Sequence, residues 1–332
     1  MSATIDVDAV ACELGRLPGC GPLAEPPRLL ARGAHSLNYL FAGPAGPLVA
    51  RLVTGSRLGL PLPAQARYEA HTLELLEPSG RTPRLVALAP EPRELPCPLL
   101  VETYLPGRPL SYASDLAAAA RCVADVHALG VPPGHRLQDQ RDPGPASVAE
   151  AHDLAAAYLG WQDAPRDSRA ALRAAFASIE RDLPAHDGLV APADLAIVND
   201  DLTTHNFIVD ADGLVALVDW ERACIAPAAQ DLAHFLLPTT TLWHDATAAW
   251  LEPEQERAML EIYLAARADR DRDRFLAQLA WLKRLVALRA VTWCAWALAT
   301  AGERPPAADN NETLAKCVMF LEPDFLAGLF GL

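Results

Sequence analysis

The chain has 332 residues, 51% of them apolar, which is long enough for two packed lobes and too apolar for global disorder. Its 28 basic and 42 acidic residues give a net charge of −14, which argues against nucleic acid and anionic membrane as partners. Seven scattered cysteines without metal-ligand spacing, and no signal-peptide pattern, favour a soluble cytoplasmic protein. The oligomeric state stays open.

The first hundred residues alternate between strand and helix patterns. Two short apolar runs, residues 37–43 and 47–53, flank a GPAG turn and predict a β-hairpin. Residues 64–78 then show helical spacing and end at a proline. Two more strand patterns, RLVALAP and PLLVETYL, follow. This part of the chain therefore predicts a small sheet with one helix laid across it.

Beyond residue 107 the pattern becomes mostly helical. After a helix that ends before Gly130, a loop rich in Pro, Gly and Asp is expected over 131–147. Further helices are expected at about 148–160, 166–181, 253–267 and 270–301. One segment, residues 195–221, interrupts them with strand character, because FIVD and LVALVD flank an ADG turn. A hairpin among helices that carries so many polar residues is a candidate functional site.

That hairpin segment contains the residue types that phosphoryl transfer needs. Asp201 is followed by Asn206 five residues later and by Asp219 eighteen residues later. Phosphoryl transfer depends on positioning and charge neutralisation: one carboxylate orients the attacking hydroxyl, and other oxygen ligands hold magnesium against the phosphates. Asp201 is the candidate for the first task, and Asn206 and Asp219 for the second. Glu221 is a further candidate, which binds metal directly or through water, lines the acceptor site, or only pairs with Arg222.

The segment NDDLTTHNFIVDADGLVALVDWERACIAPAAQDLA resembles the catalytic core of the aminoglycoside phosphotransferase and choline kinase group. The pattern of that group is roughly H-G-D-L-x-x-x-N, a hairpin, I-D-W/F-E and a later Asp. The resemblance implies that Asp201 is the catalytic residue, that Asn206 and Asp219 bind magnesium, and that Asp231 buttresses the catalytic loop. The chain departs from the pattern at Asn199, where the group has His.

The preceding segments resemble the nucleotide-binding parts of the same group, in the same order. ARGAHSLNYLF resembles the loop over the phosphates, with Gly33 and Ser36, and VARLV resembles the strand that brings a basic residue, here Arg51, to the α/β-phosphates. YEAHTLELL resembles the helix whose Glu69 pairs with that residue. LLVETYLPGRPL resembles the hinge that holds adenine by backbone groups, from Glu102 to Tyr104. The resemblance covers about residues 30–300.

The resemblance implies an α+β, protein-kinase-like bilobal fold, with a small N-terminal sheet lobe (residues 1–104) and a larger helical C-terminal lobe (residues 105–332). It also implies an ATP- and Mg²⁺-dependent phosphotransferase that acts on a hydroxyl of a small molecule. Aminoglycosides, choline-like amines, amino alcohols, sugars and macrolides are all acceptors in this group. The charge of −14 favours a cationic acceptor, or it only keeps the protein soluble.

The sequence leaves alternatives open for several residues and for the function. Asp200 supports the catalytic loop or is simply solvated, and the tryptophans of the long C-terminal helix, Trp281, Trp293 and Trp296, wall the acceptor site or fill the core. A non-catalytic nucleotide-binding scaffold (a pseudokinase) is the alternative function, supported only by Asn199. A protein kinase is disfavoured because no long activation segment follows Asp219.

Overall fold

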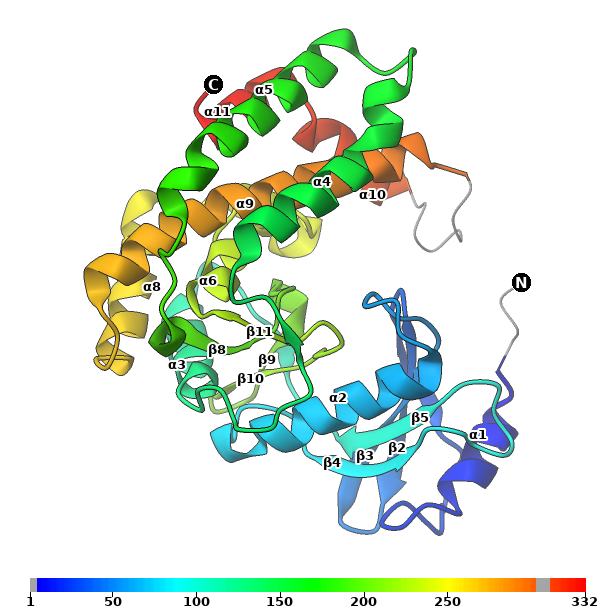
Figure 1. The fold of residues 1–332 in the computed structure, drawn as a ribbon. Coiled ribbons are helices and arrows are strands. Elements are labelled where there is room, and N and C mark those ends of the chain that lie inside the picture. The colour runs from blue at the N-terminus through cyan, green and yellow to red at the C-terminus, as the bar shows by residue number, and fades with distance from the viewer. Residues whose placement is uncertain (1–4, 303–310) are drawn as a thin grey trace. The chain divides into compact units, whose positions relative to one another are not determined.

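The computed structural model describes residues 5–302 and 311–332 of the chain (Figure 1). Contacts divide the chain into two compact units. The first contains residues 5–110, 118–138 and 205–224, and the second contains residues 111–117, 139–204, 225–302 and 311–332. Each unit is thus assembled from segments that are distant in sequence. The expected division into lobes at residues 104–105 stays a prediction.

The first unit is organised around a five-stranded antiparallel sheet of order β1-β2-β3-β5-β4. The predicted first hairpin is confirmed, with Gly43 opposite Gly46 at its turn. The helix α2 packs against the sheet (Figure 1), and α1, which the sequence reading did not identify, adds Val10 and Leu14 to the same apolar core. The bounds are α1 (Val7–Leu14), β1 (Arg28–Arg32), β2 (Ser36–Gly43), β3 (Gly46–Val53), α2 (Leu62–Leu76), β4 (Leu85–Ala89) and β5 (Leu99–Thr103).

The same unit contains the second predicted hairpin. Strands β9 (Phe207–Val209) and β10 (Val215–Leu217) pair antiparallel, and β6 (Arg108–Pro109) pairs with the other edge of β9. Gly213 has a φ of 79°, the left-handed conformation that such a tight turn requires and that glycine adopts without strain. The ADG turn is therefore where the sequence placed it. Most of α3 (Leu116–His127) belongs to this unit as well.

The second unit is built on one long helix, α9 (Arg272–Ala299), which α4 and α6 flank (Figure 1). Leu282, Leu285 and Leu288 on α9 are buried, as expected for a helix that is apolar on several faces. The strand β7 (Gln138–Asp139) lies where the chain passes from the first unit to the second. The other elements are α4 (Pro143–Gly160), α5 (Arg166–Asp182), β8 (Leu195–Val198), β11 (Cys224–Pro227), α6 (Ala229–Phe235), α7 (Pro238–Thr241), α8 (Pro253–Ala266), α10 (Asn311–Phe320) and α11 (Pro323–Phe330).

The helix α4 begins earlier than predicted. Its first residue is Pro143, within the segment that the sequence indicated as a loop. Proline is tolerated in the first turn because the N–H that it lacks has no intrahelical partner there. The proline-rich composition of 131–147 therefore marked a helix start as well as a loop. Among the described residues, no helix combines the length and the apolar character needed to cross a membrane.

Candidate active site

The open end of the β9–β10 hairpin brings two predicted magnesium ligands together. The N–H of Val218 donates to the carbonyl of Asn206 at 2.8 Å, which continues the pairing one step beyond Phe207 and Leu217. Asp219 is the next residue, and 40% of its side chain is exposed. Asn206 and Asp219 therefore lie at the same end of the hairpin. Their amide and carboxylate oxygens are hard donors of the kind that suits Mg²⁺.

Two residues near this motif have unusual backbone conformations. In the described part of the chain, the non-glycine residues with φ in the left-handed region are Asp200 (62°) and Asp219 (60°). This conformation costs a non-glycine residue roughly 1–2 kcal/mol, although Asp tolerates it better than most. Such residues concentrate at functional sites, where the surrounding structure holds them in place. Both fall in the segment identified from the sequence.

Arg51 on β3 is the centre of a buried group of ion pairs. Its Nε donates to Glu69 Oε2 at 2.8 Å, which is the pair expected between this strand and α2. Its Nη2 donates to Asp219 Oδ1 at 2.8 Å and to Glu221 Oε2 at 3.3 Å. Four residues that the sequence placed in one site are therefore in contact. Their roles toward a nucleotide and a metal stay predictions.

This group carries more negative than positive charge. Burial alone would lower the pKa of Arg51, but the charges of Asp219, Glu69 and Glu221 outweigh it and raise that pKa. Burial, with a further contribution from the charge of Asp219, raises the pKa of Glu221 to about 7, although the charge of Arg51 opposes the shift. Arg57 Nε lies 3.9 Å from Glu221 Oε1 and offsets part of the excess. An acid-rich site of this kind favours a bound cation.

The metal would need more than side-chain ligands. In residues 5–302 and 311–332, no cluster of three or more His, Cys, Asp or Glu is arranged to hold a metal ion. The predicted set is different in kind: Asp219 and Asn206 offer one carboxylate and one amide, Glu221 is a further candidate, and phosphate oxygens and water would complete the coordination. Magnesium is usually bound in this way in nucleotide sites. The residues at the hairpin end fit that pattern.

Gln65 on α2 joins the group, and the sequence reading missed it. Its Nε2 donates to Glu69 Oε1 at 2.9 Å and to the carbonyl of Glu221 at 3.0 Å, while its Oε1 accepts from Ser56 Oγ at 2.7 Å. It therefore holds two of the three carboxylate residues around Arg51, Glu69 by its side chain and Glu221 by its backbone. A signal was present, since Gln65 precedes Glu69 by four residues and so shares its helix face.

The predicted phosphate loop is the turn between β1 and β2. The N–H of Gly33 donates to the carbonyl of Ser36 at 2.9 Å, and a Cβ on Gly33 would lie 3.1 Å from Ser36 Oγ. A residue without a side chain therefore suits this close approach. Ser36 itself is buried, while Gly33 is exposed. A phosphate contact here would thus come more readily from the loop backbone than from the Ser36 hydroxyl.

The predicted hinge, Glu102 to Tyr104, leads out of β5. The N–H groups of Thr103 and Tyr104 donate to the carbonyls of Arg84 and Pro47, at 3.0 and 3.1 Å. An adenine contact from this segment falls to its remaining backbone groups. Burial raises the pKa of Glu102 to about 7, although the charge of Arg51 opposes the shift. Glu102 thus adds to the acidic surroundings of Arg51.

The loop with the predicted catalytic residue belongs to the second unit and follows β8. The carboxylate of Asp231, on α6, accepts from the N–H groups of Asn199 and Asp200, at 2.9 Å each. Asn199 Oδ1 in turn accepts from the N–H of Asp201 at 3.2 Å. Asn199 therefore supports the loop from the position where the family pattern has His. The carboxylate of Asp201 is 38% exposed above this buried framework.

His234, also on α6, lies beside Asp201. Its Nδ1 must donate to the carbonyl of Leu202, at 2.9 Å, because a carbonyl can only accept. Its Nε2 then faces Asp201 Oδ1 at 3.7 Å. Burial lowers the pKa of His234, although the charge of Asp201 opposes the shift. A neutral imidazole beside Asp201 leaves that carboxylate able to accept a proton.

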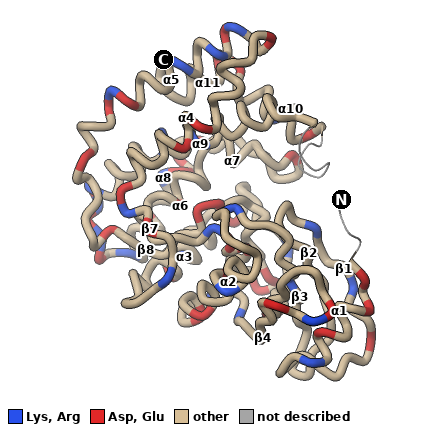
Figure 2. The backbone as a smooth tube through the Cα atoms, turned by 45° about the vertical axis from the view of Figure 1, so that its right-hand side comes forward, with Lys and Arg blue, Asp and Glu red and all other residues tan. Residues whose placement is uncertain are grey.

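The tryptophans of α9 divide into two kinds. Trp281 is buried and stacks on His186, with a centroid distance of 4.1 Å, so it belongs to the core. Trp293 and Trp296 are only partly buried, and Trp243 contacts Trp293 edge-on at 5.7 Å. Acidic and basic residues are interspersed along the chain in both units (Figure 2), so the net charge of −14 is not confined to one block.

The nucleotide and metal candidates and the catalytic candidate therefore lie in different units. Asp201 is in the second unit, and the chain passes into the first between Thr204 and His205, just before Asn206. The first unit contains a sheet with an arginine–glutamate pair and a hairpin with metal-type ligands, and the second contains a loop supported by an Asp. Each of these features is expected of a kinase-like phosphotransferase.

Sequence comparison identifies the family directly. Residues 27–276 match the model of the phosphotransferase enzyme family, so the chain belongs to that family. No curated protein matches the sequence closely enough to count as a relative.

Solved structures with low sequence identity share the fold. A choline/ethanolamine kinase family protein from Mesorhizobium loti is similar with a TM-score of 0.63 and 17% identity, over 98% of this chain and 99% of that one. A spectinomycin phosphotransferase in complex with ADP and spectinomycin has a TM-score of 0.61 and 12% identity, over 98% of each chain. An amicoumacin kinase in complex with AMP-PNP, Ca²⁺ and Ami has a TM-score of 0.66 and 14% identity, over 96% of this chain and 94% of that one.

Proposed function

We propose that this protein transfers the γ-phosphate of ATP, with Mg²⁺, to a hydroxyl group of a small molecule. The observation that carries the proposal is the contact of one buried guanidinium, that of Arg51, with Glu69 on one side and Asp219 on the other. It links a residue suited to phosphate with a residue suited to magnesium. Family membership and the nucleotide complexes of similar structures support the same reaction.

Each residue has a defined task in this proposal. Asp201 orients the acceptor hydroxyl and accepts its proton as the new oxygen–phosphorus bond forms and the bond to the β-phosphate oxygen breaks, which releases ADP. Asn206 and Asp219 hold the magnesium, which neutralises phosphate charge when it is bound. Arg51, held by Glu69, steadies the phosphates. Glu221 adjusts the charge beside Asp219 and is a further metal-ligand candidate.

For the acceptor, we propose a hydroxylated molecule with at least one positive charge. The half-buried Trp293 and Trp296 offer aromatic faces of the kind that attract a desolvated cation. The similar structures include a spectinomycin phosphotransferase and a choline/ethanolamine kinase family protein, as their descriptions state. A reducing, cytoplasmic location for the protein stays a prediction.

The test is a transfer assay with the purified chain, ATP and magnesium, against amino alcohols, aminoglycosides, neutral sugars and macrolides. ADP release and the mass of each acceptor would be followed together. A phosphorylated product is expected with a cationic member of the panel. ATP binding without transfer to any class would instead favour the non-catalytic scaffold, and a neutral sugar as best acceptor would overturn only the acceptor class.

A further inference from the structure

Asp200 stands directly before the proposed catalytic residue and is held unusually firmly. Its side chain is 1% exposed, and its φ of 62° lies in the left-handed region. This rules out the reading in which Asp200 is simply solvated. A buried carboxylate in a conformation that favours glycine needs compensating contacts. The second unit supplies these contacts from two helices.

The main partner is Arg289 on α9. Its Nη1 lies 2.8 Å from both carboxylate oxygens of Asp200, and its Nη2 donates to the carbonyl of the same residue at 3.0 Å. Gln230 on α6 donates to Asp200 Oδ1 at 2.7 Å. Arg289 therefore binds both the carboxylate and the backbone carbonyl of Asp200. The contact with the carbonyl fixes the peptide plane that leads into Asp201.

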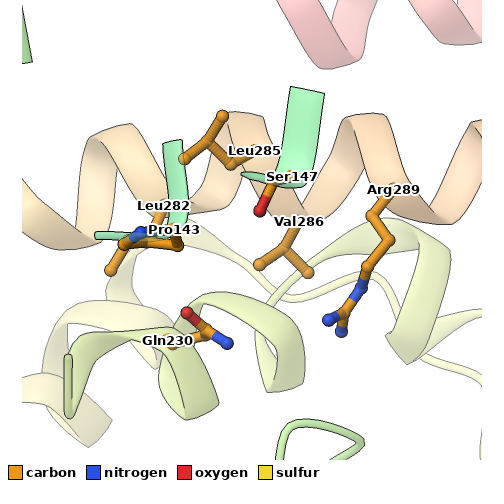
Figure 3. A pocket seen from close by; sticks show the side chains of 7 residues that line it. All are labelled: Pro143, Ser147, Gln230, Leu282, Leu285, Val286 and Arg289. Carbon is orange, nitrogen blue, oxygen red and sulfur yellow. The ribbon is translucent and has the colours of Figure 1, made fainter. Parts of the chain in front are cut away.

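The surroundings leave this arrangement little freedom. Figure 3 shows Arg289 reaching from α9 toward the α6 side, where Gln230 lies. The cavity that they line has a volume of about 10 Å³, roughly the space for one water molecule. Arg289 is itself mostly buried, with 16% of its side chain exposed. Its contacts with Asp200 and this limited space together restrict the guanidinium.

We propose that Arg289 is a positioning residue for the transfer reaction: it fixes the strained peptide at Asp200 and so aims the carboxylate of Asp201. This inference rests on the proposed function of Asp201. Asp201 itself is partly exposed, so its direction depends on the backbone that carries it. The family pattern has Gly at the Asp200 position, which adopts this φ without help. In this chain, the contacts of Arg289 with Asp200 hold the left-handed φ that glycine would adopt freely.

The pair makes a rescue experiment possible. Arg289→Ala leaves a buried carboxylate without its guanidinium and should lower kcat by about tenfold or more, a scale typical of residues that orient a functional group. The KM for ATP should stay within about twofold, because the nucleotide candidates lie elsewhere. Adding Asp200→Gly removes both the charge and the strain, so the double variant should recover kcat to within about threefold of Asp200→Gly alone.

Arg284→Ala is the matched control. Arg284 lies on the same helix and forms an ion pair with Asp182 at 2.6 Å, away from the loop, so its loss should leave kcat nearly unchanged. Thermal unfolding of every variant separates a loss of fold from a loss of positioning. An Arg289→Ala enzyme with normal kcat, or a double variant as slow as Arg289→Ala, would overturn the proposal.

A second measurement does not depend on turnover. The N–H groups of Asn199, Asp200 and Asp201 are all hydrogen-bonded within this framework. Their amide hydrogen exchange should accelerate in Arg289→Ala and slow again in the double variant. If no acceptor were ever phosphorylated, the transfer function would fail while this result could still stand. Unchanged exchange in Arg289→Ala would refute the positioning role itself.

Discussion

Two buried arginines, one in each unit, hold acidic residues in opposite ways. Arg51 contacts three carboxylates, and the side chain of one of them, Asp219, is 40% exposed. Arg289 contacts one carboxylate, that of Asp200, which is 1% exposed and has a further donor in Gln230. The first group therefore keeps an excess of negative charge, whereas charge is balanced in the second.

This difference separates two kinds of task. A charge-balanced, largely buried pair leaves no uncompensated charge for a ligand and serves mainly to fix geometry. An acid-rich group with one exposed carboxylate has uncompensated negative charge until a cation binds, and the pKa of Glu221 is raised by burial and also for this reason. We infer that the Arg51 group serves to bind metal and phosphate, and that the Arg289 group serves to position the loop that carries Asp201. Substitutions in the Arg51 group should therefore mainly weaken binding, whereas substitutions in the loop that Arg289 supports should mainly lower kcat.

The largest expected effect comes from the loop that Arg289 supports. Asp201→Asn should lower kcat by about 10²-fold or more, the scale of general-base catalysis, while ATP affinity stays nearly unchanged. Steady-state kinetics with the best acceptor and a separate nucleotide titration would measure the two quantities. Asp212→Asn, in the exposed turn of the β9–β10 hairpin, is the control. Near-native kcat in Asp201→Asn would remove this residue from the mechanism.

The next effect should appear in binding and not in turnover alone. Asp219→Ala removes the exposed carboxylate of the Arg51 group and should abolish the magnesium dependence of ATP binding, with a loss of about tenfold or more in affinity when magnesium is present. Calorimetric titration with and without magnesium would show it. The assignment of Asp219 to metal would be wrong if the variant kept the magnesium-dependent affinity of the parent chain.

The sequence alone predicted the features that depend on residues close together in the chain. Both hairpins, α2 and the spacing of Asn206 and Asp219 follow from apolar periodicity and turn residues, and the order of motifs indicated the family. The short helix α6 was missed, because seven residues are too few for a clear period. It carries Gln230 and Asp231, which contact the loop that bears the proposed catalytic residue.

The contacts that position the loop could not be predicted, because they join distant segments. Arg289 lies 89 residues after Asp200, and nothing in the local pattern of α9 distinguishes it from other helical arginines. Asp200 was open to a solvated reading for the same reason, since burial is a tertiary property. The Arg51–Glu69 pair could be expected only because the resemblance supplied a partner for each residue.

The smallest expected effect concerns charge balance in the Arg51 group. The pKa of Glu221 is raised to about 7, so between about pH 4.5 and 7 the folded protein holds a proton that the unfolded chain has lost. The free energy of unfolding should therefore fall as the pH rises through that window, by on the order of 3 kcal/mol for this group. Glu221→Gln should flatten the fall without abolishing it, because the pKa of Glu102 is also about 7.

Urea unfolding of the metal-free protein from pH 4.5 to 8 would measure this slope, and Glu254→Gln offers a control because that side chain is 72% exposed. An unchanged slope in Glu221→Gln would show that Glu221 is not the group that keeps the extra proton in the folded protein. Magnesium should reduce the slope in the parent chain, since a cation bound beside Glu221 lowers the pKa of that carboxyl group. The Asp200–Arg289 pair carries no net charge, so magnesium should not change its contribution to the pH dependence of the free energy of unfolding.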